Sequence, residues 1–246
     1  SFVISRVMLL HLKNLLTPDE LAQGRALLTA PDAPWRDGRH SAGAQAVGVK
    51  QNQQLAQDSA TAATLRALVL GALQRDPLVL SAALPRKIFN PLFNRYNSHG
   101  AGHGDPHGDH YGAHVDGAVM HSAASGQWVR SDLSCTVFFS DPADYDGGEL
   151  VVHGAPGEAA QRIKLPAGDA ILYPGTSVHE VTPVTRGARL ASFLWIESMV
   201  RSGEQRRLLF EMDMALLALR AQHGESAEAT RLTGVYHNLL RLWAST

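Results

Sequence analysis

Hydrophobic positions recur at helical spacing in the first third of the chain. Residues 17–20 (Thr-Pro-Asp-Glu) predict a helix start, with Thr17 as the cap and Glu20 placed to complete a capping box. This helix should run to about Leu28. A second helical pattern ends at Arg75, and its apolar positions are Leu55, Leu65, Leu68, Val69, Ala72 and Leu73. We therefore expect residues 8–85 to form a mainly helical segment that packs on the main domain.

From about residue 86 the pattern changes to short runs rich in Val, Phe, Tyr and Thr, separated by Gly, Pro and Asp. Such runs predict an antiparallel fold of many strands. Residues 146–148 (Asp-Gly-Gly) and 166–169 (Pro-Ala-Gly-Asp) supply turn residues that tolerate positive φ or fix a bend. The predicted strands are Leu92–Tyr96, Ser134–Phe139, Glu149–His153, Gln161–Leu165, Ala170–Tyr173 and Arg189–Ile196. A mainly β sandwich or jelly roll over residues 86–200 follows.

Residues 201–246 return to helical spacing and predict a C-terminal helical extension. Two apolar stripes mark its helices: Leu208, Leu209, Met212, Leu216 and Leu217, then Leu232, Val235, Tyr236, Leu239, Leu240 and Trp243. We expect these helices to pack against the β domain, and the stripes are compatible with a homodimer.

Composition narrows the class of protein. A chain of 246 residues with 45% hydrophobic content fits one domain with extensions. The formal net charge of −1 gives no basic field for nucleic acid or an anionic membrane. Cys135 is the single cysteine, so no internal disulfide forms, and we expect a cytoplasmic protein. No apolar run reaches the roughly 20 residues of a membrane span. Residues 1–7 lack a signal-peptide pattern, and we expect them to be non-native residues before a natural start at Met8.

Three His-x-Asp triplets begin at His103, His107 and His114. In a strand, side chains two residues apart share a face, so such a triplet presents an imidazole and a carboxylate to one point. Glycine occupies the centre of the first two triplets, whereas Val115 favours a strand in the third. His114 and Asp116 are therefore the preferred metal ligands.

The third ligand must come from elsewhere in the chain. His179 follows a predicted turn, strand and loop that deliver it at the start of another strand, whereas His121 and His153 are weaker alternatives. Two histidines and one carboxylate on one face of an octahedron leave three positions for small molecules, as in iron(II) oxygenases.

Arg189 lies ten residues after His179 and begins an apolar strand. A guanidinium inside the β domain is costly unless it meets an anion, and arginine binds a carboxylate through two parallel hydrogen bonds. The distal carboxylate of 2-oxoglutarate is such an anion. The alternative is a surface ion pair on an edge strand.

The chain resembles the PKHD-type hydroxylases, relatives of prolyl 4-hydroxylase among the iron(II)- and 2-oxoglutarate-dependent dioxygenases, in their iron-uptake-associated group. The resemblance rests on FNRYN, YGAHVDGAVM, GTSVHEVTPVTRGARLASFLWIES and RRLLFEMD, and it covers nearly the whole chain from Met8. It implies a double-stranded β-helix, iron on His114, Asp116 and His179, and 2-oxoglutarate on Arg189. Tyr96 resembles the family's strand tyrosine that faces the co-substrate, and some members use L-ascorbate as a reductant.

The resemblance implies an O₂-dependent hydroxylase that converts 2-oxoglutarate to succinate and CO₂ while it acts on an unidentified small molecule or peptide. One alternative is a non-catalytic iron-binding or iron-sensing jelly roll. Another is a zinc or manganese hydrolase or isomerase, in which Glu180 or Glu149 acts as the general base.

Four histidines gather between His99 and His110, in a stretch rich in glycine. Our hypothesis is that this stretch lies at the mouth of the site and gates substrate or captures metal; the alternative is a solvated insertion.

Overall fold

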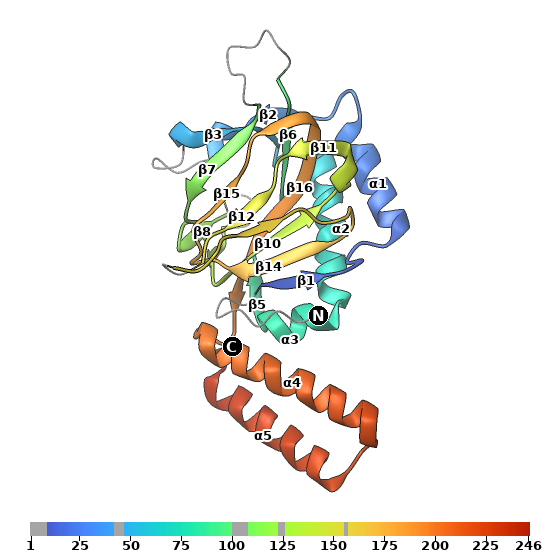
Figure 1. Ribbon diagram of the computed structural model, residues 1–246, viewed down its shortest axis with the longest axis vertical. Coiled ribbons are helices and arrows are strands. Elements are labelled where there is room, and N and C mark those ends of the chain that lie inside the picture. Colours follow the sequence, from blue (N-terminus) through green and yellow to red (C-terminus); the bar gives the residue numbers. More distant parts are fainter. Residues whose placement is uncertain (1–8, 42–46, 100–107, 123–125, 155–156) are drawn as a thin grey trace.

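Two β-sheets face each other in the body of the computed structural model, which describes residues 9–41, 47–99, 108–122, 126–154 and 157–246. Helices cover the outer face of the larger sheet, and a hairpin of two further helices extends from one end of the body (Figure 1). The mainly β fold with flanking helices predicted from the sequence is confirmed.

The larger sheet is antiparallel and contains nine of the described strands. Seven of them run in the order β1 (Leu10–Leu12), β14 (Ala170–Pro174), β10 (Leu133–Phe138), β16 (Val184–Ser198), β6 (Leu92–Asn97), β4 (Gln53–Leu55) and β2 (Trp35–Asp37). β5 (Pro85–Ile88) and β11 (Tyr145–Gly147) also pair with β16. All six residues of β10 are buried, because helices cover one face of this sheet and the smaller sheet covers the other.

The smaller sheet carries five described strands in the order β13 (Gln161–Ile163), β12 (Leu150–Val152), β15 (His179–Val181), β7 (His110–His114) and β3 (Lys50–Gln51). β8 (Val119–His121) and β9 (Trp128–Arg130) form a separate hairpin. The predicted turn at residues 146–148 requires glycine: Gly147 has a φ of 68°, and a Cβ there would lie 1.9 Å from the Pro183 carbonyl oxygen.

Three helices precede the jelly roll. The capping box of α1 (Pro18–Thr29) is present as predicted, since Thr17 N donates to Glu20 Oε2 at 2.8 Å and Glu20 N donates to Thr17 Oγ1 at 3.3 Å. α2 (Ala60–Arg75) buries its apolar stripe in the main core, and α3 (Pro77–Ala83) follows it. The prediction of a mainly helical first third was incomplete, because β1 to β4 lie in it and pair with strands of both sheets.

The C-terminal helices differ from their expected placement against the β domain. α4 (Gly203–His223) and α5 (Ala227–Trp243) pack on each other, and α4 also contacts α3 (Figure 1). From this hairpin, Phe210 joins the buried core of the main body and the partly buried Met214 packs against that core, whereas a separate cluster joins Leu209, Leu216 and Tyr236 to Leu84 and Val200. Leu208, Leu217, Leu232, Val235 and Leu242 remain exposed.

None of the described helices has the length and apolarity that a membrane crossing requires. The division of the chain at residues 85/86 and 200/201 remains a prediction, and residues 1–7 lie outside the described residues.

Candidate metal centre

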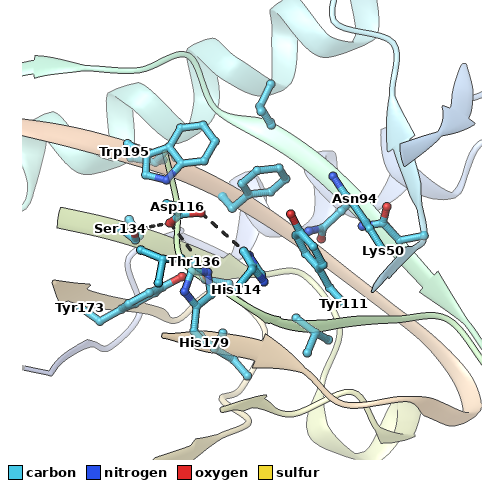
Figure 2. A pocket seen from close by; sticks show the side chains of 18 of the residues that line it. Lys50, Asn94, Tyr111, His114, Asp116, Ser134, Thr136, Tyr173, His179 and Trp195 are labelled. Atoms are coloured by element: carbon cyan, nitrogen blue, oxygen red, sulfur yellow. Dashed lines mark hydrogen bonds and ion pairs between the residues drawn. The ribbon is translucent and has the colours of Figure 1, made fainter. Parts of the chain in front are cut away.

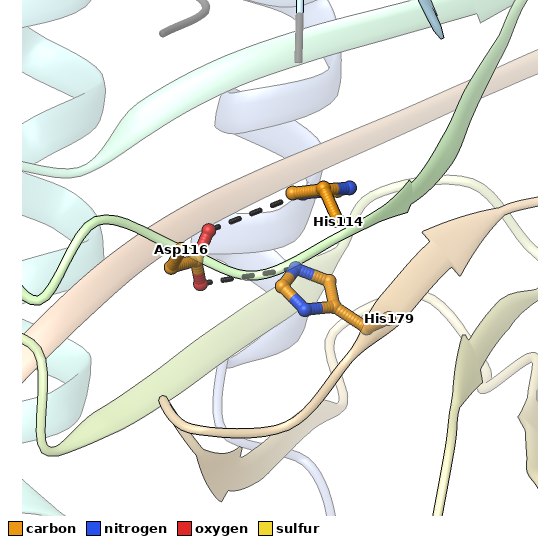
Figure 3. Close-up of side chains that lie close together, drawn as sticks. All are labelled: His114, Asp116 and His179. Atoms are coloured by element: carbon orange, nitrogen blue, oxygen red, sulfur yellow. Dashed lines mark ion pairs between the residues drawn. The ribbon is translucent and has the colours of Figure 1, made fainter. Parts of the chain in front are cut away.

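His114 and His179 come from neighbouring strands of the smaller sheet. His114 ends β7, His179 begins β15, and the two are Cα partners across this antiparallel pair. Asp116 lies just beyond the end of β7 rather than inside a strand, and it still turns its carboxylate toward both rings (Figure 3). Chain segments about 65 residues apart in sequence therefore meet at one point.

The three side chains form a compact set of potential ligands. One ligand atom from each lies within 4.8 Å of the other two. Asp116 Oδ1 is 4.0 Å from His114 Nε2, and Asp116 Oδ2 is 3.7 Å from His179 Nε2. Among the described residues, this is the one group of three His, Cys, Asp or Glu side chains that could share an ion. Two imidazoles and a carboxylate suit iron(II) in an oxygenase.

Backbone carbonyls determine which nitrogen of each ring carries the proton. His114 Nδ1 lies 2.8 Å from the Gly112 carbonyl oxygen, and His179 Nδ1 lies 3.1 Å from the Ser177 carbonyl oxygen. Because a carbonyl only accepts, both Nδ1 atoms donate, and each neutral ring leaves the Nε2 lone pair toward Asp116. Burial, together with the nearby His179, lowers the pKa of His114 to about 4, so the ring is neutral at physiological pH.

The carboxylate of Asp116 is also oriented. Ser134 on β10 donates its hydroxyl to Asp116 Oδ2 at 2.8 Å, so the larger sheet holds a candidate ligand that follows a strand of the smaller one (Figure 2). Hydrogen bonds of this kind fix the direction of a metal ligand.

Arg189 and Tyr96 lie side by side on the larger sheet, as Cα partners across β16 and β6. Arg189 is 1% exposed, and its guanidinium carbon is 5.4 Å from the Tyr96 ring centroid and 5.3 Å from that of Phe138. Its Nε and Nη1 atoms have no hydrogen-bond partner among the described residues. Burial raises the pKa of Tyr96 to about 12, and Arg189 partly offsets this rise, so the phenol is a neutral donor.

A cavity of about 520 Å³ joins these features. His114, Asp116, His179, Arg189 and Tyr96 all line it. Further lining residues that the sequence analysis did not identify are Lys50, Asn52, Gln54, Asn94, Tyr111, Ser134, Phe193 and Trp195. Residues 50–54 are an uninterrupted polar run, so the sequence alone gave no signal for which of them face the cavity.

The other candidate residues lie elsewhere. The ring of His121 lies against Trp128 in the β8–β9 hairpin, at 4.6 Å between centroids. His153 Nε2 is 3.3 Å from Glu180 Oε1, and Glu149 Oε2 is 3.1 Å from Arg162 Nη1. None of these four predicted candidates lines the cavity described above.

The histidine-rich stretch is only partly described. His99 Nε2 lies 2.7 Å from Asp109 Oδ1, and His110 begins β7. His103 and His107 lie outside the described residues, so the hypothesis of a gate or metal-capturing stretch remains a prediction.

Two family models match the chain. The model of the 2OG-Fe(II) oxygenase superfamily matches residues 92–197, and that of the PKHD-type hydroxylase C-terminal domain matches residues 204–245. A PKHD-type hydroxylase of Polaromonas sp. strain JS666 is 58% identical over 239 residues, which cover 97% of this chain and 100% of that protein.

Solved structures agree in fold. The non-heme alpha ketoglutarate dependent carbocyclase SnoK from nogalamycin biosynthesis has a TM-score of 0.53 at 14% identity, over 78% of this chain and 80% of that chain. A prolyl hydroxylase from Trichoplax adhaerens, in complex with a hypoxia inducible factor peptide fragment, has a TM-score of 0.51 at 15% identity, over 82% of this chain and 86% of that chain. At such identities the likeness is one of fold, and it confirms the predicted double-stranded β-helix.

Proposed function

Because this chain belongs to the PKHD-type hydroxylases and is an iron(II)- and 2-oxoglutarate-dependent dioxygenase, we propose that His114, Asp116 and His179 hold its iron and that Arg189 binds the distal carboxylate of 2-oxoglutarate. Family membership disfavours the alternatives of a non-catalytic iron protein and of a zinc or manganese hydrolase.

The main support for the proposal is the buried guanidinium of Arg189. A buried guanidinium whose Nε and Nη1 lack partners among the described residues is costly, and an anion in the cavity removes this cost. A dicarboxylate that reaches from the metal triad toward Arg189 supplies that anion. The phenol of Tyr96, beside Arg189, donates a further hydrogen bond to the same carboxylate.

When bound, iron and 2-oxoglutarate supply the oxidising chemistry, in which O₂ converts 2-oxoglutarate to succinate and CO₂ and hydroxylates the prime substrate. The residues of this chain would hold the iron and 2-oxoglutarate and orient them. His114 and His179 present Nε2 because their Nδ1 protons are bound to carbonyls, and Ser134 holds the Asp116 carboxylate. Phe193 and Trp195 give the cavity an apolar wall that excludes water near the metal ligands.

The prime substrate that we propose is a small molecule or a peptide. The cavity is large enough for a small substrate beside 2-oxoglutarate. As the family resemblance implies, L-ascorbate would serve as a reductant. The exposed leucines of α4 and α5 support a homodimer, and the single buried cysteine supports a reducing, cytoplasmic location. The formal net charge of −1 supports a protein without nucleic acid or membrane partners.

Anaerobic reconstitution tests the proposal. Iron(II) is added to the protein, 2-oxoglutarate is titrated, and the weak visible charge-transfer band of the chelate is recorded. The band should appear in the unaltered protein and should require far more 2-oxoglutarate in Arg189→Ala. Arg186→Ala is the matched control, because Arg186 is exposed on the same strand and pairs with Asp146. Bound iron without the band would contradict the proposal.

A further inference from the structure

Three polar side chains alternate along one short segment of the cavity wall. Lys50, Asn52 and Gln54 are 5%, 5% and 7% exposed, and all three line the cavity. The intervening Gln53 faces away, and its side-chain oxygen accepts from Arg95 Nε at 2.8 Å. Because side chains two residues apart share a face of an extended chain, residues 50, 52 and 54 form a polar stripe.

Gln54 meets a second polar residue across the sheet. Gln54 and Asn94 are Cα partners of β4 and β6, and both are 7% exposed. Gln54 Nε2 and Asn94 Oδ1 have no hydrogen-bond partner among the described residues. A donor and an acceptor thus lie together on the cavity wall, and buried polar atoms in this state usually indicate a missing partner.

Lys50 adds a positive charge on the side of the smaller sheet. Its Nζ lies 5.0 Å from the Tyr111 ring centroid, and Figure 2 shows Lys50, Asn94 and Tyr111 together on one side of His114, with Trp195 beyond Asp116 on the other. Burial lowers the pKa of Lys50 to about 8, partly offset by Asp116, so the ammonium is still mostly charged at neutral pH.

Lys50 and Arg189 are separate cationic positions. Arg189 lies on β16 of the larger sheet, whereas Lys50 lies on β3 of the smaller sheet, where it pairs with Tyr111 of β7. If Arg189 takes the distal carboxylate of 2-oxoglutarate, Gln54 Nε2 and Asn94 Oδ1 still have no partner among the described residues, and Lys50 supplies a second cation on the same cavity wall.

We propose that this wall, composed of Lys50, Gln54 and Asn94, binds the prime substrate, and that the substrate is a small carboxylic acid that also carries an amide. The carboxylate pairs with Lys50 Nζ, the amide carbonyl accepts from Gln54 Nε2, and the amide N–H donates to Asn94 Oδ1. This inference rests on the proposed function.

The separation of Lys50 from Gln54 limits the length of the substrate. Lys50 and Gln54 are four positions apart, so their Cα atoms lie at most about 13 Å from each other. A ligand that reaches both therefore needs several bonds between its acid and its amide. 4-Acetamidobutanoate has this form, and 4-acetamidobutanamide is its uncharged counterpart.

The test uses the full chain loaded with Mn(II), which is paramagnetic and does not turn over, in the presence of saturating 2-oxoglutarate. Proton relaxation of each probe reports how closely it approaches the metal. We expect 4-acetamidobutanoate to reach half-saturation at a concentration at least tenfold lower than 4-acetamidobutanamide. Lys50→Met should abolish this preference, and Gln54→Leu should weaken both probes alike. Lys13→Met is the matched control, because Lys13 is exposed and does not line the cavity.

Relaxation of the 2-oxoglutarate protons, recorded in the same samples, distinguishes a failure of the proposed function from a failure of the inference about the prime substrate. If 2-oxoglutarate is not relaxed, the proposed function is wrong and the inference is lost with it. If 2-oxoglutarate is relaxed but neither probe is, or both probes bind equally, only the inference is wrong. Preference for the acid that persists in Lys50→Met also overturns it.

Discussion

His114 and His179 are Cα partners across β7 and β15, and each ring contacts through Nδ1 the backbone carbonyl of the residue two positions before it. The local backbone thus orients both proposed ligands in the same way. Each ring is held in one tautomer before a metal binds, and this lowers the entropic cost of metal binding.

Loss of the carboxylate should remove iron. We expect Asp116→Ala to lower iron(II) affinity by more than the roughly 10–100-fold typical of an outer partner, and to abolish succinate formation. Iron content after gel filtration and succinate release measure the two effects. Glu180→Gln is the control, because Glu180 follows His179 directly but pairs with His153. Unchanged succinate production in Asp116→Ala would remove the ligand assignment.

Ser134 should act through Asp116. Ser134→Ala removes the hydroxyl that donates to Asp116 Oδ2, and iron(II) affinity should fall by roughly 10–100-fold without loss of the fold. Equilibrium binding of iron(II) under anaerobic conditions gives the value. Ser140→Ala tests a buried serine whose hydroxyl donates to the Ala188 carbonyl instead, and it should leave iron affinity unchanged.

Arg189 should reduce stability in the absence of 2-oxoglutarate. Arg189→Met removes two buried nitrogens without partners among the described residues, so the free energy of unfolding should rise by about 1–3 kcal/mol. Urea denaturation without ligand measures this change. A decrease in stability would indicate that Arg189 has a structural role, and the anchor would have to be sought elsewhere.

Lys50 should make stability depend on pH. Its pKa falls from 10.5 in the unfolded chain to about 8 in the folded one, so the unfolded chain binds more protons between these values. The destabilising effect of Lys50 is therefore complete below pH 8 and is lost as the pH rises to 10.5. Lys50→Met should be more stable by about 3 kcal/mol at pH 7, with a difference that shrinks toward pH 10.5.

Chemical denaturation of both proteins across this pH range measures the Lys50 effect. The tyrosines titrate in both proteins, so their contribution cancels in the difference. Lys13→Met should show no such pH-dependent difference, since Lys13 is exposed. A constant difference for Lys50→Met at all pH values would mean that the charge of Lys50 is not the cause.

Local signals in the sequence predicted the parts of the fold that local interactions determine. The capping box at Thr17 and Glu20 and the glycines at residues 147 and 148 act within a few residues, and the structure has them as predicted. His114, Asp116 and His179, selected by spacing and strand context, are brought together.

The pairing of strands that lie far apart in the chain could not be predicted from one sequence. β3 has two residues and β4 has three, too few for a periodic pattern, and their hydrogen bonds come from β7 and β6 some 40 to 60 residues later. Lys50 and Gln54 were therefore missed as lining residues. The C-terminal stripes were recognised as apolar, but their pattern is the same whether the partner is a sheet or another helix.

The division of the site between two sheets has a consequence for the life of the protein in the cell. The histidines belong to the smaller sheet, whereas Arg189 and Tyr96 belong to the larger one. A co-substrate that contacts both sheets links them to each other. Ligands that bind only the folded state disfavour the locally unfolded states that proteases cleave. Degradation of this enzyme should therefore be fastest when iron or 2-oxoglutarate is scarce, so that its abundance follows the supply of its metal and its co-substrate.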